Sequence, residues 1–334
     1  MTNQASDQLT QAQGGTLPRL GLGCGTFGRE IGEAEAFALM DYAVEHGITL
    51  FDTAEAYGGG QARAQRRARY GIDDHREVSA EMHSSEKIVG RWFKSRGGRD
   101  RVTLVTKVSS NFNRAAVRAA LTASLARLQT DRVEFYLYHS PDPKTPAAEA
   151  ATAMADVIQA GLARRGGLSN TSVPQLREAL QVTPGSMDPP YRVVELCGNL
   201  LRFDHDAYSV AREAGLDTLA YSPLAAGFLT GKYTADAASI PRGTRFDIMP
   251  QHAELYFGAG NFALLDRLHA LAREACVPAV QLAVAWVCHQ PMVSTVLIGA
   301  RHTGHLANAL TAVKLKLQPA WLEQMNRWHA ELIS

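Results

Sequence analysis

The stretch VTLVTKVSSNFNRAAVRAALTASLARLQTDRVEFYLYH, residues 102–139, holds two short apolar runs with an amphipathic segment between them. The runs at 102–108 and 133–139 are rich in β-branched and aromatic residues, which is typical of strands buried on both faces. Residues 114–130 have the apolar spacing of a helix with one buried face. The stretch therefore predicts a strand–helix–strand unit.

The same alternation continues in both directions along the chain. Further strand-like runs lie at residues 19–28, 48–54, 164–170, 192–199, 217–224 and 294–300, with amphipathic stretches such as 33–47 and 264–277 between them. Eight strand–helix alternations without a clear linker favour a closed (β/α)8 TIM barrel in a single domain over an open doubly wound sheet. We expect this barrel to occupy residues 17–334, after a flexible N-terminal leader at residues 1–16.

Composition narrows the class of protein. The chain has 334 residues, of which 46% are hydrophobic, and a formal net charge of +1, so no overall field attracts nucleic acid or an anionic membrane. Its four scattered cysteines include no CxxC pair and predict reduced thiols instead of a disulfide or zinc framework. No apolar run approaches the roughly 18 residues that span a bilayer, and the polar N-terminus lacks the regions of a signal peptide. We therefore expect a cytoplasmic protein without a nucleic-acid or membrane partner.

Two connections are too long to be simple turns. One is an insert of residues 59–83 after the second strand, and the other runs from about residue 225 to 260 after the seventh. Both follow a strand, which places them on the C-terminal face of the barrel, where barrel enzymes carry out their chemistry. Long loops in compact domains are usually functional or mobile.

Polar residues end or follow three consecutive strands: Asp52 and Tyr57 after the second, Lys107 in the third and His139 in the fourth. A buried lysine is costly unless it is paired, and Asp52 on the neighbouring strand is the natural partner. The lysine charge is expected to lower the pKa of Tyr57, so that its phenol passes a proton near neutral pH, while His139 orients a carbonyl. Such a site suits carbonyl reduction, and since no side chain supplies hydride, a nicotinamide cofactor is required.

The motifs GLGCGTFG, FDTAEAYG, SSEKIVGRW, TKV, YLYHSPDP, GLSN, AYSPLAAGFLTGKY and VLIGARHTGHL resemble those of the aldo-keto reductase family in order and spacing. The resemblance covers roughly residues 17–312. It implies a (β/α)8 barrel that uses a nicotinamide cofactor, usually NADPH. It also implies that Asp52, Tyr57, Lys107 and His139 form the catalytic tetrad.

The resemblance further implies a set of cofactor-binding residues: Gly25, Thr26, Asp52, Ser169, Asn170, Glu195, Tyr221, Ser222, Leu224, Gly299, Arg301, His305 and Asn308. Three positions depart from the family's pattern, since Glu195 and His305 stand where glutamine is usual, and Asn308-Ala309 replaces a Glu-Asn pair. Arg301 favours NADP, because a guanidinium suits a 2′-phosphate, with NAD as the alternative.

Phe27 and Phe112, with Tyr57 and His139, are candidates to line a substrate pocket. For the two phenylalanines, packing at the rim of the barrel is an equal alternative. His302 and His305 have no carboxylate or cysteine near them in sequence, so no metal site is predicted.

The insert is where the chain leaves the family's pattern. Gly58 and Ser85 are separated by 26 residues, and a helical insert would place Arg63, Arg66, Arg67 and Arg69 on one face as a basic patch. Three interpretations stay open: a solvated surface loop, a lid for an anionic substrate, or a contact for self-association in an oligomeric state that the sequence leaves open.

The sequence as a whole predicts an NADP-dependent oxidoreductase acting on a small carbonyl compound or alcohol, with Tyr57 as general acid or base. A sugar-like or anionic substrate is expected from the insert and from residues 85–108. The alternatives are a redox-sensing nucleotide-binding regulatory protein, and an epimerase or lyase that keeps its cofactor tightly bound on the same fold.

Overall fold

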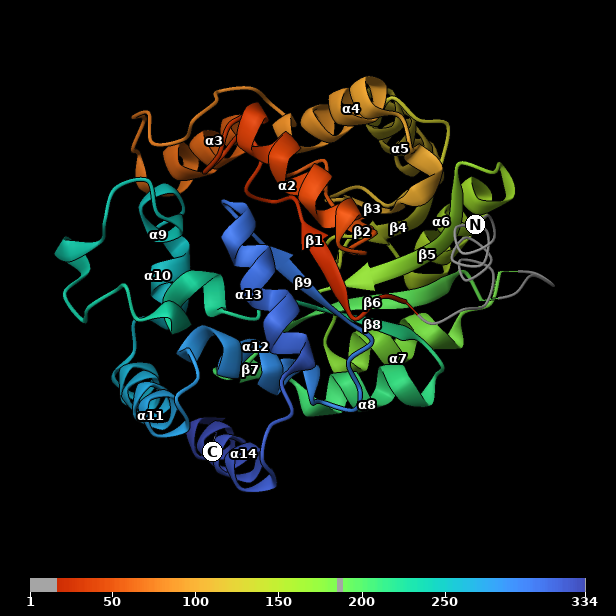
Figure 1. The fold of residues 1–334 in the computed structure, drawn as a ribbon. Helices are drawn as coiled ribbons and strands as arrows, with labels where there is room; N and C mark the ends of the chain where they lie inside the picture. Colours follow the sequence, from red (N-terminus) through yellow and green to blue (C-terminus); the bar gives the residue numbers. More distant parts are fainter. Residues whose placement is uncertain (1–16, 185–188, 334) are drawn as a thin grey trace, which may run out of the picture.

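The computed structural model describes residues 17–184 and 189–333 (Figure 1). The predicted leader, residues 1–16, lies outside the described residues.

Eight parallel strands form the predicted barrel. They are β1 (Leu20–Gly23), β2 (Leu50–Asp52), β3 (Thr103–Val108), β4 (Val133–Tyr138), β5 (Ala163–Ser169), β6 (Tyr191–Asn199), β8 (Asp217–Tyr221) and β9 (Thr295–Gly299). Their order is β5-β4-β3-β2-β1-β9-β8-β6, and a further β5–β6 pairing closes the circle. The short β7 (Arg202–Phe203) adds an antiparallel pair at the end of β6. The predicted (β/α)8 barrel is confirmed.

Helices surround the barrel (Figure 1). They are α2 (Glu33–Glu45), α4 (Ser84–Arg96), α5 (Arg114–Leu128), α6 (Ala147–Gln159), α7 (Val173–Gln181), α8 (His205–Glu213), α11 (Ala259–Ala275), α12 (Ala279–Cys288), α13 (Thr303–Lys314) and α14 (Pro319–Ile333). Helix α5 illustrates how the sequence sets their bounds. Asn113 caps its N-terminus by accepting the amide of Ala116, and Val117, Leu121 and Leu128 lie buried along one face.

The barrel interior and the layer between strands and helices form separate apolar clusters. The inner one consists of Leu50, Val105, Phe135, Leu137, Val193, Leu219 and Leu297. These side chains fill the barrel, so it is a packed core with no channel. The site described below is found at the rim of this apolar interior.

The two long connections fold against each other. The insert begins with α3 (Gly59–Tyr70), and the second connection contains the short helices α9 (Arg245–Ile248) and α10 (Gln251–Tyr256) after two turns of 3-10 helix, Ala225–Thr230 and Ala237–Ser239. Figure 1 shows α3 and α9 side by side, and Ala62, Ile248 and Met249 form a small apolar cluster between them. The insert is thus an ordered, packed part of the barrel's C-terminal face.

No single helix in the described part of the chain is long and apolar enough to cross a membrane; α11 and α12 pass such a test only as a pair that is bent by 101°.

Candidate active site

The pairing of β2 with β3 brings Asp52 and Lys107 together at the rim. Asp52 is opposite Val105, and Lys107 lies two residues further along the same face. The Lys107 side chain is fully buried, and its Nζ donates to Asp52 Oδ1 at 2.5 Å and to the carbonyl of Thr53 at 3.0 Å. The predicted partner of the buried lysine is therefore the one found.

Tyr57 and His139 complete a cluster of four around this ion pair, which we call the Tyr57 cluster (Asp52, Tyr57, Lys107, His139). Lys107 Nζ lies 3.4 Å from the Tyr57 hydroxyl and 4.9 Å from the centre of its ring. The His139 ring meets the Tyr57 ring edge to face, with centroids 5.3 Å apart and planes at 83°. Three separate strand ends thus place an acid, an ammonium, a phenol and an imidazole within contact of each other.

Glu195 belongs to the same cluster of charges, on the other side of Lys107. Its Oε2 lies 3.3 Å from Lys107 Nζ, and the Asp52 carboxylate pairs with the same ammonium. Burial and the Asp52 carboxylate raise the pKa of Glu195 to about 8, because two carboxylates so close cannot both ionise cheaply beside one ammonium. The two carboxyl groups therefore share a proton at neutral pH, with Glu195 as the protonated member because Asp52 is nearer to Lys107.

The charge state of Tyr57 differs from the sequence-based expectation. Burial raises the pKa of Tyr57 above its ordinary value, and although Lys107 acts to lower it, Asp52 and Glu195 act with burial. The sequence-based prediction that Lys107 lowers the pKa of Tyr57 below its ordinary value is therefore wrong, because burial outweighs the effect of the lysine charge. Burial opposes the charge of Lys107, but Asp52 and Glu195 outweigh it and raise the pKa of the ammonium. A protonated phenol therefore faces a permanent positive charge.

His139 is neutral in this environment. Burial, with a smaller contribution from Lys107, lowers the pKa of His139 to about 3. Its Nδ1 lies 3.4 Å from Ser109 Oγ, and its backbone amide donates to the carbonyl of Val108. A neutral imidazole has one N–H to donate and one nitrogen to accept, so His139 can orient a polar group without adding charge.

A second ion pair, whose Glu86 carboxylate is fully buried, supports β3 from behind. Glu86 accepts from Thr106 Oγ1 at 2.6 Å and pairs with Arg127 at 2.6 Å. Thr106 precedes Lys107 on the strand and points to the opposite face, as strand geometry requires. Glu86 of the SSEKIVGRW motif thus holds the strand that carries the lysine.

Comparison with known proteins agrees with this architecture. The sequence model of the Aldo/keto reductase family matches residues 19–330. The chain belongs to the aldo/keto reductase family. It is 32% identical over 306 residues to aldo-keto reductase YhdN of Bacillus subtilis, an alignment that covers 86% of this chain and 82% of the relative. It is 30% identical over 308 residues to a probable voltage-gated potassium channel subunit beta of rice (Oryza sativa subsp. japonica), with coverage of 86% and 84%.

Among solved structures, an aldo/keto reductase from Klebsiella pneumoniae in complex with NADP and acetate superposes with a TM-score of 0.69 at 24% identity, covering 94% of this chain and 92% of the other. The family resemblance expected from the motifs is therefore confirmed. As an aldo-keto reductase, the chain is an NAD(P)-dependent oxidoreductase of the barrel type.

The residues expected to bind the cofactor's nicotinamide end lie on strand ends around the Tyr57 cluster. Ser169 is the last residue of β5 and pairs in register with Glu195 on β6. Asn170 follows in a left-handed conformation (φ 56°), donates to the carbonyl of His139 at 2.8 Å and accepts from the Tyr221 hydroxyl at 2.6 Å. Asn170 thus ties the fourth, fifth and seventh barrel strands together at this aldo-keto reductase's rim.

The backbone after β8 is held in an uncommon conformation. Ser222, Ala225 and Ala226 all have positive φ (59°, 51° and 56°), in the left-handed region that L-residues rarely adopt. Leu224 lies between them, half-buried against the core. Strain of this kind is typical of ligand-binding segments.

Residues expected at the cofactor's phosphates lie at the ends of β9 and β1. Gly299 is exposed, and nothing lies within 4 Å of the position a Cβ would take, while Thr26 Oγ1 donates to the carbonyl of Ala300 at 2.9 Å. Arg301 is exposed and donates to the carbonyl of Gly243 at 3.2 Å, and Asn308 accepts from Gln281 on α12.

A group of cations gathers near Arg301. Burial lowers the pKa of Lys232, and the charge of Arg301 lowers it further. Burial with His302, Arg301 and Lys232 lowers the pKa of His305 to about 4. These shifts mark a region of concentrated positive charge. No group of three or more His, Cys, Asp and Glu side chains within the described ranges could hold a metal ion.

Phe27 and Phe112 do not open onto a pocket. They are 0% and 3% exposed in the main core, and Phe112 stacks on Tyr138 with ring centroids 4.1 Å apart. The structure therefore favours the packing alternative for both residues over a place in the substrate pocket.

The arginines of the insert do not form a free basic patch. Arg66 is buried, with Nη2 2.8 Å from Glu77 and Nε 3.1 Å from Asp74. Its Nη1 donates to the carbonyl of Ile248 in α9, and Arg69 pairs with Glu254 in α10. Helical spacing predicts that Arg66 shares a face with the other arginines of α3. The sequence pattern does not reveal that the chain reverses after α3 and brings Asp74 and Glu77 to Arg66.

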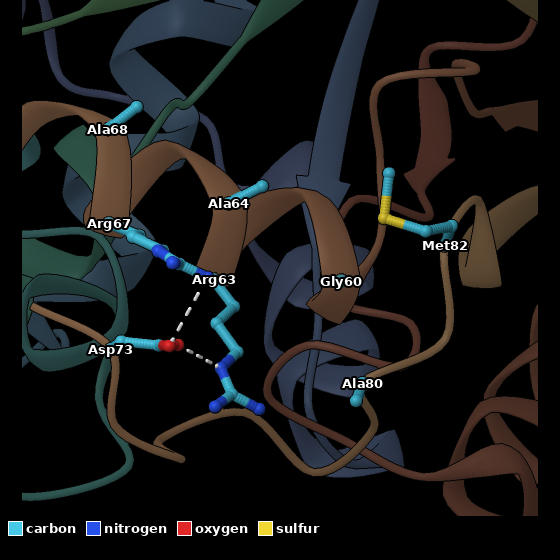
Figure 2. A pocket seen from close by; sticks show the side chains of 8 residues that line it. All are labelled: Gly60, Arg63, Ala64, Arg67, Ala68, Asp73, Ala80 and Met82. Atoms are coloured by element: carbon cyan, nitrogen blue, oxygen red, sulfur yellow. Dashed lines mark hydrogen bonds and ion pairs between the residues drawn. The ribbon is translucent and has the colours of Figure 1, made fainter.

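The outer side of the insert carries an open groove of about 500 Å³. It is lined by Gly60, Arg63, Ala64, Arg67, Ala68, Asp73, Ala80 and Met82, none of which belongs to the Tyr57 cluster. Figure 2 shows Arg63 and Arg67 both directed at Asp73, at 2.7 Å and 3.4 Å. The positive charge in this groove is therefore partly neutralised within the insert itself.

Proposed function

We propose that this aldo-keto reductase reduces a small carbonyl compound with NADPH, and that Tyr57 gives the proton. The observation that carries this proposal is the contact of Lys107 Nζ with the Tyr57 hydroxyl, 3.4 Å apart, at a rim where Asp52 fixes the lysine and His139 packs on the phenol. The cofactor supplies hydride when it is bound.

The residues present fit a dinucleotide. Strained backbone at Ser222 and Ala226 follows β8, and the open surface at Gly299 lets a ligand approach the main chain. Lys232 and Arg301 repel one another. An anionic phosphate bound beside them would be attracted by both cations and would also relieve their mutual repulsion. We assign the carboxamide end to Ser169 and Asn170, with Glu195 as an acceptor for the amide.

NADP is favoured over NAD. Arg301 is exposed at the end of β9, where its guanidinium can bind a 2′-phosphate through parallel N–H donors. The comparison structure from Klebsiella, described as a complex with NADP, supports the same choice. NAD would leave the charge of Arg301 without a partner.

Each of the four residues of the Tyr57 cluster has its own role in proton transfer. The Tyr57 hydroxyl holds the proton and gives it to the carbonyl oxygen as negative charge develops there. Lys107 stabilises the phenolate that remains, Asp52 keeps the lysine in place, and neutral His139 donates a hydrogen bond to the same carbonyl oxygen. In the direction of oxidation the same phenol acts as the base.

The substrate is a sugar-like or anionic carbonyl compound. Lys107 and His139 contact the phenol, and the apolar Phe27 and Phe112 are buried in the core, so neither phenylalanine offers apolar surface to a substrate. A compound that carries hydroxyl, carboxylate or phosphate groups fits such surroundings best.

Steady-state oxidation of NADPH with a panel of ketosugars, oxo acids and simple aldehydes tests the proposal. We expect turnover that saturates with at least one polar carbonyl compound, and slower turnover with NADH. Bound cofactor without turnover of any carbonyl compound would contradict the proposed reaction.

That second outcome would favour a redox-sensing regulatory protein, the candidate suggested by the relative named as a potassium channel subunit beta. The two functions differ in whether bound NADPH is consumed. The complete set of proton-transfer groups around Tyr57 favours the enzyme.

A further inference from the structure

Arg29, in the loop after β1, has an unused side of its guanidinium turned toward the Tyr57 cluster. The residue is 4% exposed, and its Nη2 is buried without a hydrogen-bond partner among the described residues. A buried donor that makes no bond costs about 1–3 kcal/mol in general, and more when it is charged, so a native structure keeps one only for a reason such as a ligand.

Gly25 shows where this nitrogen lies. A Cβ on Gly25 would stand 3.5 Å from Arg29 Nη2 and 3.6 Å from Cδ2 and Cε2 of the Tyr57 ring. The sum of those distances, about 7 Å, is the upper limit on the separation of Nη2 from the ring. Because glycine has no Cβ, the space between guanidinium and phenol is left for another group.

The surroundings of Arg29 hold more positive than negative charge. Glu30 pairs with Arg29 Nε at 2.8 Å and with Arg245 Nη1 at 2.9 Å, so one carboxylate serves two guanidinium groups. Arg245 also donates to Nδ1 of His252, whose pKa is lowered to about 4 by burial and by Arg29, so this imidazole stays neutral. One positive charge is left over, next to the proposed proton donor.

The insert and the loop after β8 enclose this arrangement. The amide of Val78 in the insert donates to the carbonyl of Arg29 at 3.0 Å, and Arg245 reaches it from α9 through Glu30. Arg66 and Arg67 of the insert pair with Glu77 and Asp73 of the same segment, so the contact of the insert with Arg29 is the backbone hydrogen bond of Val78.

We propose that Arg29 binds an anionic oxygen group, a carboxylate or phosphate, of the carbonyl substrate while Tyr57 protonates its oxygen. This assignment deepens the proposed function and rests on it. A guanidinium held at Nε presents its remaining N–H groups in the geometry that carboxylates and phosphates accept. The limit of about 7 Å to the phenol ring means that the anion lies only a few bonds from the carbonyl. The class of substrate is therefore a short oxo acid or a small phosphorylated aldehyde or ketone.

The test compares the short oxo acid 4-oxobutanoate with its uncharged methyl ester in the NADPH complexes of wild type and Arg29→Gln. We expect the preference for the acid over the ester, as a ratio of kcat/KM, to fall by about 10- to 100-fold in Arg29→Gln, the loss of one charged hydrogen bond. Arg29→Lys, which keeps the charge but loses the planar fork, should lie between the two. The control is Arg118→Gln on the outer helix α5, where the preference should stay as in wild type.

The affinity for NADPH, measured by the fluorescence of the nucleotide, shows whether Arg29 binds a cofactor phosphate instead of the substrate. It also checks that the variant is folded. If Arg29→Gln weakens NADPH binding and leaves the acid/ester preference intact, Arg29 serves a cofactor phosphate and the proposal is overturned. An unchanged preference with unchanged NADPH affinity overturns it as well.

If wild type reduces neither probe nor any compound of the panel, the proposed reaction fails, and calorimetric titration of the NADPH complex with 4-oxobutanoate still decides the role of Arg29. Binding that is lost in Arg29→Gln supports the anion site, and equal binding by both proteins overturns it.

Discussion

Lys107 Nζ lies 2.5 Å from Asp52 Oδ1 and 3.3 Å from Glu195 Oε2, so one buried ammonium faces the carboxyl groups of both residues. Because one ammonium cannot balance two buried carboxylates, one of the two carboxyl groups keeps its proton at neutral pH. The family's usual glutamine would not titrate, so this chain has a pH dependence that glutamine would not confer.

Replacing Glu195 with glutamine should flatten the dependence of stability on pH. Unfolded, Glu195 loses its proton near its ordinary value of 4.5, but folded it keeps the proton to about pH 8. In that window the folded state binds the extra proton, so the free energy of unfolding falls as pH rises, by at most about 1.4 kcal/mol per pH unit. Urea unfolding across the window should show wild type losing stability relative to Glu195→Gln.

The exposed Glu149 on α6 provides the control, because Glu149→Gln should leave the slope of wild type unchanged. Parallel curves for wild type and Glu195→Gln would mean that Glu195 is ionised in the folded protein.

Replacing Tyr57 with phenylalanine tests the proton donor alone, since only the hydroxyl is removed. We expect carbonyl reduction to fall by about 10²- to 10⁴-fold, the usual contribution of a positioned acid, with NADPH affinity close to that of wild type. NADPH titration and steady-state kinetics measure the two effects separately. Tyr42→Phe on α2, whose ring stacks on His46 outside the Tyr57 cluster, is the matched control. Activity of Tyr57→Phe at the level of wild type would remove this residue from the acid role.

The sequence predicted the barrel because its strands are buried on both faces and therefore read as apolar runs. It also predicted the Asp52–Lys107 pair, since strands adjacent in the chain are adjacent in the sheet. Glu195 is different. It lies on β6, and β3 and β6 are separated in the sheet by β4 and β5. Only closure of the barrel brings the two side chains together, so neither the carboxyl pair nor the raised pKa of Tyr57 could be inferred from neighbouring motifs.

Arg29 and Arg66 show the same limit for single arginines. The sequence identified a run of arginines in the insert but not which of them would meet carboxylates. Arg66 finds Glu77 and Asp74 because the insert reverses after α3, and Arg29 keeps a free edge because Glu30 is shared with Arg245. Which arginine meets which carboxylate depends on how the loops fold back on one another, and the composition of the chain does not predict this.

Removing the buried arginine of the insert should destabilise the protein strongly. Arg66→Met leaves the Glu77 carboxylate, which is 0% exposed, without its cation, and breaking a buried pair from one side costs about 3–5 kcal/mol. Adding Glu77→Gln should restore part of the loss, because the orphaned charge is then gone. Chemical unfolding of the single and double variants measures both effects.

The control is Arg67→Ala. The Arg67 side chain is 71% exposed, so this variant should change the free energy of unfolding by less than about 0.5 kcal/mol. Equal effects of Arg66→Met and Arg67→Ala would show that the insert contributes no buried ion pair.

Neutralising the two arginines of the groove tests the insert as a lid for anionic substrates. Arg63 and Arg67 both pair with Asp73, so their two positive charges are partly compensated, and the Arg67 side chain is 71% exposed to solvent. We therefore expect the double variant Arg63→Gln/Arg67→Gln to keep KM for an anionic carbonyl substrate within about twofold of wild type, since screened surface pairs contribute at most about 1 kcal/mol. Steady-state kinetics at low and high salt make the test sharper, because a steering effect of these charges would weaken as salt rises. A KM that increases tenfold at low salt, and less at high salt, would restore the lid interpretation and place substrate recognition in the insert.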